Sequence, residues 1–173
     1  AACIMLILSI AACENRQGNT DSKEIAEDQN EAKFDNTQLE DDTEFSVKAA
    51  NGGLMEVELG KLAQTKALHQ QVRDFGAMMV TDHSKANEEL KTLAGKKNIS
   101  LPTALSDDEQ RKYDELNAKQ ADEFDREYIS FMIKDHKEDI DEFKQQAREG
   151  KDAEIRDWAS SKIAALEHHL AKA

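Results

Sequence analysis

Apolar side chains recur at three- and four-residue steps along four long segments of the chain. In the clearest segment they include Val72, Phe75, Met79 and Leu90. This spacing places them on one face of an α-helix, because the helix turns once in 3.6 residues. Gly52-Gly53, within the first segment, either interrupts that helix or lets a neighbour come close. The pattern predicts long helices over residues 43–67, 69–94, 121–149 and 152–170.

The residues between these segments predict how the helices are connected. A tight turn joins the first two long helices, and another joins the last two. In the longer connection, Pro102 precedes Ser106-Asp107-Asp108-Glu109, a capping-box pattern that predicts a short helix to about residue 116. Gly95 and Gly150 are expected to end the helices before them. These elements predict an all-α fold, a four-helix bundle with a short extra helix in the crossover.

The first twelve residues form an apolar, uncharged stretch that is too short to span a bilayer. It has the length of a signal-peptide core, so residues 1–12 are expected to be a removable signal peptide whose start lies further upstream. Ile10-Ala11-Ala12-Cys13 resembles the bacterial lipobox. We therefore expect Cys13 to carry a lipid anchor that attaches the protein to a membrane. The alternatives are an ordinary cleaved signal followed by a chance cysteine, or an uncleaved membrane helix.

The segment after Cys13 is strongly acidic. Residues 14–44 contain eleven acidic against three basic residues and few apolar ones. Such a composition favours an extended, disordered chain. We expect residues 13–44 to be a lipidated, disordered linker and residues 45–173 to be the helical bundle domain.

Overall charge and cysteine content exclude some function classes. With 23 Lys and Arg against 36 Asp and Glu, the net charge of −13 repels phosphate backbones, so no nucleic-acid partner is expected. Both cysteines, Cys3 and Cys13, lie at the N-terminus, so the body of the chain has no disulfide framework. The sequence also lacks a nucleophile elbow and a glycine-rich phosphate loop. Any enzymatic activity would require a bound metal, and we expect a non-enzymatic protein.

Several charged and imidazole side chains fall on the apolar faces of the predicted helices. Successive residues are rotated by 100° around a helix axis, and by this rule these side chains point toward the bundle interior. An unpartnered carboxylate in such a position costs several kcal/mol, so its presence calls for an explanation. The inward-facing candidates for metal ligands are Glu56, Asp82, His83 and His136, and those expected to support them from further out are Asp125, Asp135 and His169.

The heights of these residues along the bundle can be estimated from the rise of 1.5 Å per residue. Glu56 and His83 both lie about 18 to 22 Å from the turn between their helices, so they can face each other. His136 lies about 21 Å from the turn at Gly150, but His169 lies about 28 Å from it. This difference of about one helical turn predicts that His169 is not a direct ligand.

Inward carboxylates and imidazoles on facing helices are the groups with which bundle proteins bind metals. This mixture of ligands suits divalent Fe, Mn, Zn or Cu. The alternative is a buried polar network, in which Glu56, His83 and Asp82 satisfy one another by hydrogen bonds.

Over residues 45–173 the sequence resembles the bacterial envelope family called domain of unknown function 4142. The resemblance depends on Glu56 in MEVELGKLA, the doublets Asp82-His83 and Asp135-His136, the pair Phe124-Asp125 and the closing His169-Leu170. It implies a ferritin-like bundle, often exported or lipid-anchored, without an established activity. The residues three positions before His83 and His136 are Val80 and Ile133, so the Glu-x-x-His motif of di-iron bundles is absent.

The sequence therefore predicts a lipid-anchored protein of the cell envelope, at the periplasmic or outer membrane. We expect its helices to bind a divalent metal ion or a small polar ligand. The alternative is an envelope interaction or stress-protection module with a protein partner and a purely structural polar interior. A metal-dependent redox enzyme is a third hypothesis.

Overall fold

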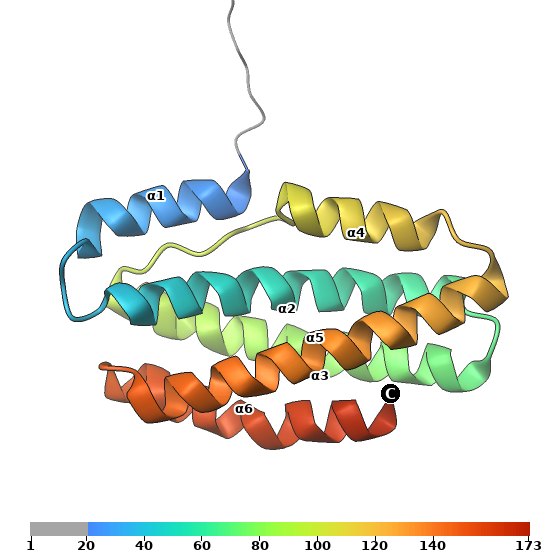
Figure 1. Ribbon diagram of the computed structural model, residues 1–173. Helices are drawn as coiled ribbons and strands as arrows, with labels where there is room; N and C mark the ends of the chain where they lie inside the picture. The colour runs from blue at the N-terminus through green and yellow to red at the C-terminus, as the bar shows by residue number, and fades with distance from the viewer. Residues whose placement is uncertain (1–20) are drawn as a thin grey trace, which may run out of the picture.

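The computed structural model describes residues 21–173, and the predicted signal segment and Cys13 lie outside this range. The described residues form helices and connecting segments without a β-strand (Figure 1). The helices are α1 (Ser22–Phe34), α2 (Glu40–Lys66), α3 (Gln70–Lys97), α4 (Asp107–Asn117), α5 (Ala121–Glu149) and α6 (Ala153–Lys172).

Two antiparallel hairpins, α2–α3 and α5–α6, build the bundle. Each helix packs mainly against its hairpin partner, while α2 also contacts α5 and α3 contacts α6. The chain crosses from one hairpin to the other through α4, which lies end to end with α1 along α2 (Figure 1). The predicted all-α four-helix bundle with a short helix in its crossover is confirmed. A single long crossover is also the connection found in ferritin-like bundles.

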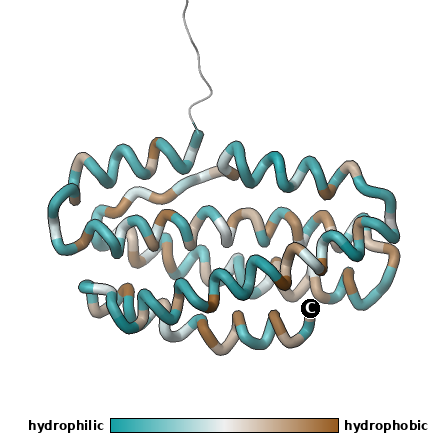
Figure 2. The backbone as a smooth tube through the Cα atoms, viewed as in Figure 1, coloured by the Kyte–Doolittle hydropathy of each residue, from teal (hydrophilic) through white to brown (hydrophobic). Residues whose placement is uncertain are grey.

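The apolar core lies toward the two ends of the bundle. Figure 2 shows apolar residues recurring along the four bundle helices, while α1 and α4 are largely hydrophilic. Near the α2–α3 turn, Leu59, Phe75, Phe124 and Tyr128 pack together. At the other end the core is built by Ile140, Phe143, Ala159 and Leu166. Polar side chains, described below, lie between these two apolar regions in the middle of the bundle.

Small residues let α2 and α3 approach closely. A Cβ atom at Gly76 would lie 2.7 Å from the carbonyl oxygen of Gly60 and 2.8 Å from the Cβ of Ala63. Real Cβ atoms do not pack this closely, so the crossing requires glycine there. The helix continues through Gly52-Gly53 without a break, and a Cβ atom at Gly53 would collide with the Asn87 side chain.

The predicted end of α3 at Gly95 is wrong, because the helix continues to Lys97. The capping residue that follows is Asn98, whose φ of 59° lies in the left-handed region. Asparagine tolerates this conformation better than most residues, and the amide of Ile99 then donates to the Ala94 carbonyl at 2.9 Å. The predicted cap of the short helix is confirmed, since Ser106 Oγ accepts a hydrogen bond from the Glu109 amide.

The expected disorder of residues 13–44 is wrong for the part that the structure describes. Residues 22–34 form α1, and α2 begins at Glu40, before the predicted domain boundary at residue 45. Helix α1 packs on α2 and forms hydrogen bonds to the segment after α3. The Asn30 side chain donates to the Ser100 carbonyl and accepts from the Ser100 amide, both at 2.8 Å. Composition does not show such pairing between a side chain and distant backbone.

Buried aspartates connect the two hairpins. Asp125, at the start of α5, accepts hydrogen bonds from the amides of Leu68 and His69 in the α2–α3 turn, at 3.0 and 2.8 Å. Asp42, at the start of α2, accepts from the amides of Lys151 and Asp152 in the α5–α6 turn. Each carboxylate therefore fixes the height of one hairpin against the turn of the other.

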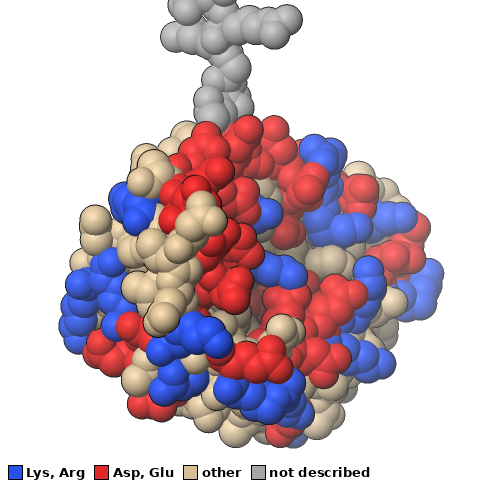
Figure 3. Space-filling model, turned by 60° about the vertical axis from the view of Figure 1, so that its left-hand side comes forward, with Lys and Arg blue, Asp and Glu red and all other residues tan. Residues whose placement is uncertain are grey.

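The surface carries charges of both signs. The groove between α1 and α2 is lined by acidic residues, including Glu27, Glu31 and Glu44, together with Lys23 and Lys48. Figure 3 shows acidic side chains gathered on this end of the molecule, with lysines and arginines interspersed. Within residues 21–173, no helix has the length and apolar character needed to cross a bilayer.

We predict that Asn30→Ala loosens α1 without unfolding the bundle. The substitution leaves the Ser100 amide and carbonyl without their partner, which costs about 1 to 3 kcal/mol. Hydrogen exchange should become faster in residues 22–34 and stay unchanged in α3. The control is Asn117→Ala, because Asn117 is exposed and its side chain makes no hydrogen bond in the described structure. Equal protection of α1 in wild type and Asn30→Ala would contradict this role.

We predict that Asp125→Asn destabilises the protein by about 1.5 to 3 kcal/mol at pH 7, as expected for hydrogen bonds to a charged group. Burial raises the pKa of Asp125, but the hydrogen bonds from His69 and Leu68 outweigh burial and hold this pKa below its usual value. Its stabilising effect is therefore present above the unfolded pKa of about 3.9 and is lost as the pH falls through the folded pKa.

Urea unfolding at several pH values tests this prediction. The difference between wild type and Asp125→Asn should be largest near neutral pH and should shrink in acid. Asp122→Asn, at an exposed position of the same helix, is the control. Equal stability of wild type and Asp125→Asn at pH 7 would show that this link between the hairpins is dispensable.

Candidate metal site

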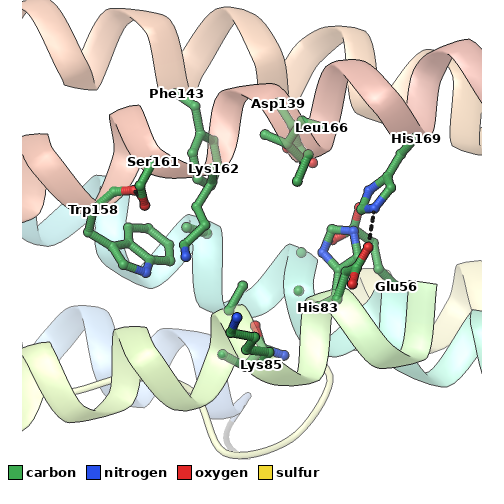
Figure 4. A pocket seen from close by; sticks show the side chains of 17 residues that line it. Glu56, His83, Lys85, Asp139, Phe143, Trp158, Ser161, Lys162, Leu166 and His169 are labelled. Carbon is green, nitrogen blue, oxygen red and sulfur yellow. Dashed lines mark hydrogen bonds and ion pairs between the residues drawn. The ribbon is translucent and has the colours of Figure 1, made fainter. Parts of the chain in front are cut away.

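Four buried side chains meet in the middle of the bundle, one from each long helix. They are Glu56 of α2, His83 of α3, His136 of α5 and His169 of α6, with exposed fractions of 2%, 7%, 0% and 1%. We call these four residues the central cluster. Figure 4 shows Glu56, His83 and His169 converging beside a cavity.

The distances within the central cluster are short. His83 Nδ1 lies 2.6 Å from Glu56 Oε2, and His136 Nε2 lies 3.5 Å from Glu56 Oε1. His136 Nε2 also lies 3.3 Å from His169 Nδ1. The three imidazoles each offer a nitrogen within 4.8 Å of the others. Ligands about 2.1 Å from one ion stand about 3.4 Å apart in a tetrahedron, so the 3.3 and 3.5 Å separations suit a metal, while the 2.6 Å contact of His83 with Glu56 is shorter.

His169 lies in the central cluster, although its distance from the turn predicted that it was too remote. The prediction compared Cα heights and ignored the direction of the side chains. Every helical side chain leans toward the N-terminus of its helix. His136 therefore leans away from the α5–α6 turn and His169 leans toward it, so the two rings meet although their Cα atoms are offset.

Asp82, predicted as a direct ligand, contacts His169 instead. Its Oδ2 lies 2.9 Å from His169 Nε2, and its side chain is 44% exposed. A carboxylate in this position accepts a hydrogen bond from the N–H of Nε2, and the lone pair of the neutral imidazole is then on Nδ1, which faces the cluster. Asp82 thus orients the His169 ring.

Two further aspartates, both on α5, lie close to the central cluster. Asp135, expected to support the site from further out, lies close to it, since it groups with Glu56 and His136 with ligand atoms within 4.8 Å of one another. Its buried Oδ2 has no hydrogen-bond partner. Asp139 lines the adjacent cavity (Figure 4) and was not predicted. Its position four residues after Asp135, on the same face of α5, was the signal that could have identified it.

Asp125, also expected near the site, is remote from it and binds the α2–α3 turn. It shares a helix face with His136, but the two positions are eleven residues apart, which is about 16 Å along α5. The angular position of Asp125 around the helix therefore predicted the correct helix face but not its height along the bundle axis. The predicted lipid anchor, Cys13, lies outside the described residues.

Burial controls the protonation of the site. It raises the pKa of Glu56 well above its usual value, and burial together with neighbouring acids raises the pKa of Asp135 to about 10. Burial lowers the pKa of His83 to about 4 and that of His136 to about 3. At pH 7 and without a cation, Asp135 holds its proton and these two imidazoles are neutral, while the raised pKa makes Glu56 easier to protonate than a free carboxyl group. Neutral imidazole is the form that coordinates a metal.

The structure thus defines an all-α bundle protein with imidazoles and carboxylates buried at its centre. The family model described as "Domain of unknown function (DUF4142)" matches residues 26–173. The chain belongs to this family, as the sequence resemblance implied. Neither the curated proteins nor the solved structures contain a significant match to it.

Proposed function

We propose that this protein binds a divalent transition metal ion in the central cluster. The observation that carries the proposal is the convergence of three buried imidazoles and a buried carboxylate from four helices. His83, His136 and His169 supply nitrogen ligands and Glu56 an oxygen ligand. Divalent Fe, Mn, Zn and Cu all accept this combination.

Atoms without partners support a metal over a purely structural network. Glu56 Oε1, His83 Nε2 and Asp135 Oδ2 are buried and have no hydrogen-bond partner. A polar network built for stability satisfies nearly all of its buried atoms. Among residues 21–173, no lysine or arginine forms an ion pair with Glu56 or Asp135, so a divalent cation that displaced their protons would be the charge partner of these acids.

We also propose that the bundle is attached to a membrane of the bacterial envelope through a lipid on Cys13. The support is the lipobox-like Ile10-Ala11-Ala12-Cys13 after an apolar segment. Several acyl chains on one cysteine would hold the protein at the membrane stably, because each buried CH₂ contributes about 0.8 kcal/mol.

We predict that metal ions raise the melting temperature of the wild-type protein. An ion that binds only the folded state at about one hundred times its Kd adds about 2.7 kcal/mol of stability. The double variant His83→Ala, His136→Ala should lose this response. His168→Ala is the matched control, because His168 is the exposed neighbour of His169. Thermal unfolding with and without Zn²⁺, Mn²⁺, Fe²⁺ or Cu²⁺ measures the effect.

A purely structural network gives a different result in the same experiment. It predicts that the double variant is destabilised by about 1 to 3 kcal/mol while neither protein responds to metal. Absence of stabilisation of wild type by all four ions at neutral pH would therefore refute the metal proposal.

We predict that Cys13→Ala releases the protein from the membrane fraction and leaves the bundle folded. The experiment expresses the full precursor in a bacterium and labels it with a fatty-acid analogue. Cys3→Ala is the control, because Cys3 lies within the expected signal peptide. Labelling of Cys13→Ala equal to that of wild type would overturn the anchor assignment.

A further inference from the structure

A cavity of about 260 Å³ extends from the central cluster toward the outside of the bundle. It lies between α2, α3, α5 and α6, and small residues such as Ala49, Gly52, Ala86 and Ala165 leave the space open. Figure 4 shows Trp158 and Lys162 at one end and His83, Glu56 and His169 at the other. The cavity therefore extends from the proposed metal site to the aromatic ring of Trp158.

The aromatic end of the cavity has an unused hydrogen-bond donor. Trp158 Nε1 is buried and has no partner. The ring of Phe143 lies 5.6 Å from that of Trp158, and both side chains line the cavity. An indole N–H can only donate, so an occupant that satisfies it must present an acceptor such as oxygen. The aromatic walls favour a planar, apolar body.

The volume limits the occupant to a small molecule. A cavity of about 150 Å³ is large enough for benzene. The larger cavity here therefore has room for one six-membered ring with a substituent at each end.

The charges at the aromatic end argue against an amine. The ammonium of Lys162 already lies 5.9 Å from the centre of the Trp158 ring and pairs with Glu89. A second cation would compete with Lys162 for the face of the indole. At the opposite end, a bound divalent ion would attract a carboxylate.

We infer that the cavity binds a single-ring aromatic carboxylate, with its acid group on the metal ion beside His83 and an oxygen at its far end accepting a hydrogen bond from Trp158. This inference rests on the proposed metal site. It goes further by assigning the class of small molecule that the site takes.

The test uses 4-hydroxybenzoate as the probe and calorimetry on the zinc-loaded protein. Benzoate lacks the far oxygen, and cyclohexanecarboxylate lacks the planar ring. We expect 4-hydroxybenzoate to bind about two- to tenfold more tightly than benzoate, the range for one hydrogen bond. Trp158 is the only tryptophan of the chain, so its fluorescence reports binding independently. Cyclohexanecarboxylate binding as tightly as 4-hydroxybenzoate would overturn the aromatic assignment.

Two glycine variants locate the binding site. A Cβ at Gly52 meets nothing within 4 Å and Gly52 lines the cavity, so Gly52→Leu fills that space. Gly95→Leu is the matched control, because Gly95 also lies in a helix with open space around it but outside this cavity. Gly52→Leu should weaken 4-hydroxybenzoate binding by more than about tenfold and leave zinc binding unchanged. Wild-type affinity in Gly52→Leu would place the ligand elsewhere.

A Trp158→Phe variant tests the hydrogen bond without depending on the glycine variants. Phenylalanine keeps an aromatic wall and removes the N–H, so 4-hydroxybenzoate and benzoate should bind Trp158→Phe with equal affinity. A preference for 4-hydroxybenzoate that persists in this variant would overturn the role of Trp158.

A zinc titration of the wild-type protein separates failure of this inference from failure of the metal proposal. Zinc binding without any 4-hydroxybenzoate binding would overturn the ligand inference alone. If zinc does not bind, the same probe is titrated into the metal-free protein. Binding that Gly52→Leu abolishes would then overturn the role of the metal and keep the cavity as the site of the aromatic acid, and absence of binding would overturn the whole inference.

Discussion

Two buried carboxylates hold the hairpins of this bundle at a fixed height relative to each other. Asp42 binds the α5–α6 turn and Asp125 binds the α2–α3 turn, each through consecutive backbone amides. Apolar packing alone tolerates some sliding of one helix along another, whereas these hydrogen bonds exist at only one height. The central cluster depends on this constraint, because its four side chains come from both hairpins.

The two hairpins are built alike around these carboxylates. Asp42 and Asp125 lie 83 residues apart, and so do Arg73 and Arg156. Each arginine donates to two carbonyls of the turn that precedes its own helix. The same offset relates Glu56 to Asp139, which explains why acidic groups enter the bundle centre from both hairpins. The middle of the molecule thus combines several acids at a place where other bundles have apolar side chains.

The protonation of the centre bears on the metal binding that we propose. Burial keeps His83 and His136 neutral and Asp135 protonated, and it raises the pKa of Glu56, so burial lowers the charge of the centre when no metal is bound. A divalent ion would exchange for the acidic protons and would find neutral imidazoles already in place. The cavity toward Trp158 gives such an ion contact with small molecules. A closed structural metal site has no need of this opening.

The four long helices, the short crossover helix and the inward direction of Glu56, His83 and His136 could all be predicted from the amino-acid sequence. Helical periodicity is a local property, and these residues lie on faces that the apolar residues define. Local pattern could not show that α1 is ordered, because Asn30 is held by the backbone of Ser100, seventy residues away. It also misplaced Asp125 and His169 along the bundle axis. The face of a helix on which a residue lies follows from the rotation of 100° per residue. Whether side chains from different helices meet depends on the relative heights of the helices and on the direction in which each side chain points along its helix. Both are set when the helices pack in the tertiary structure.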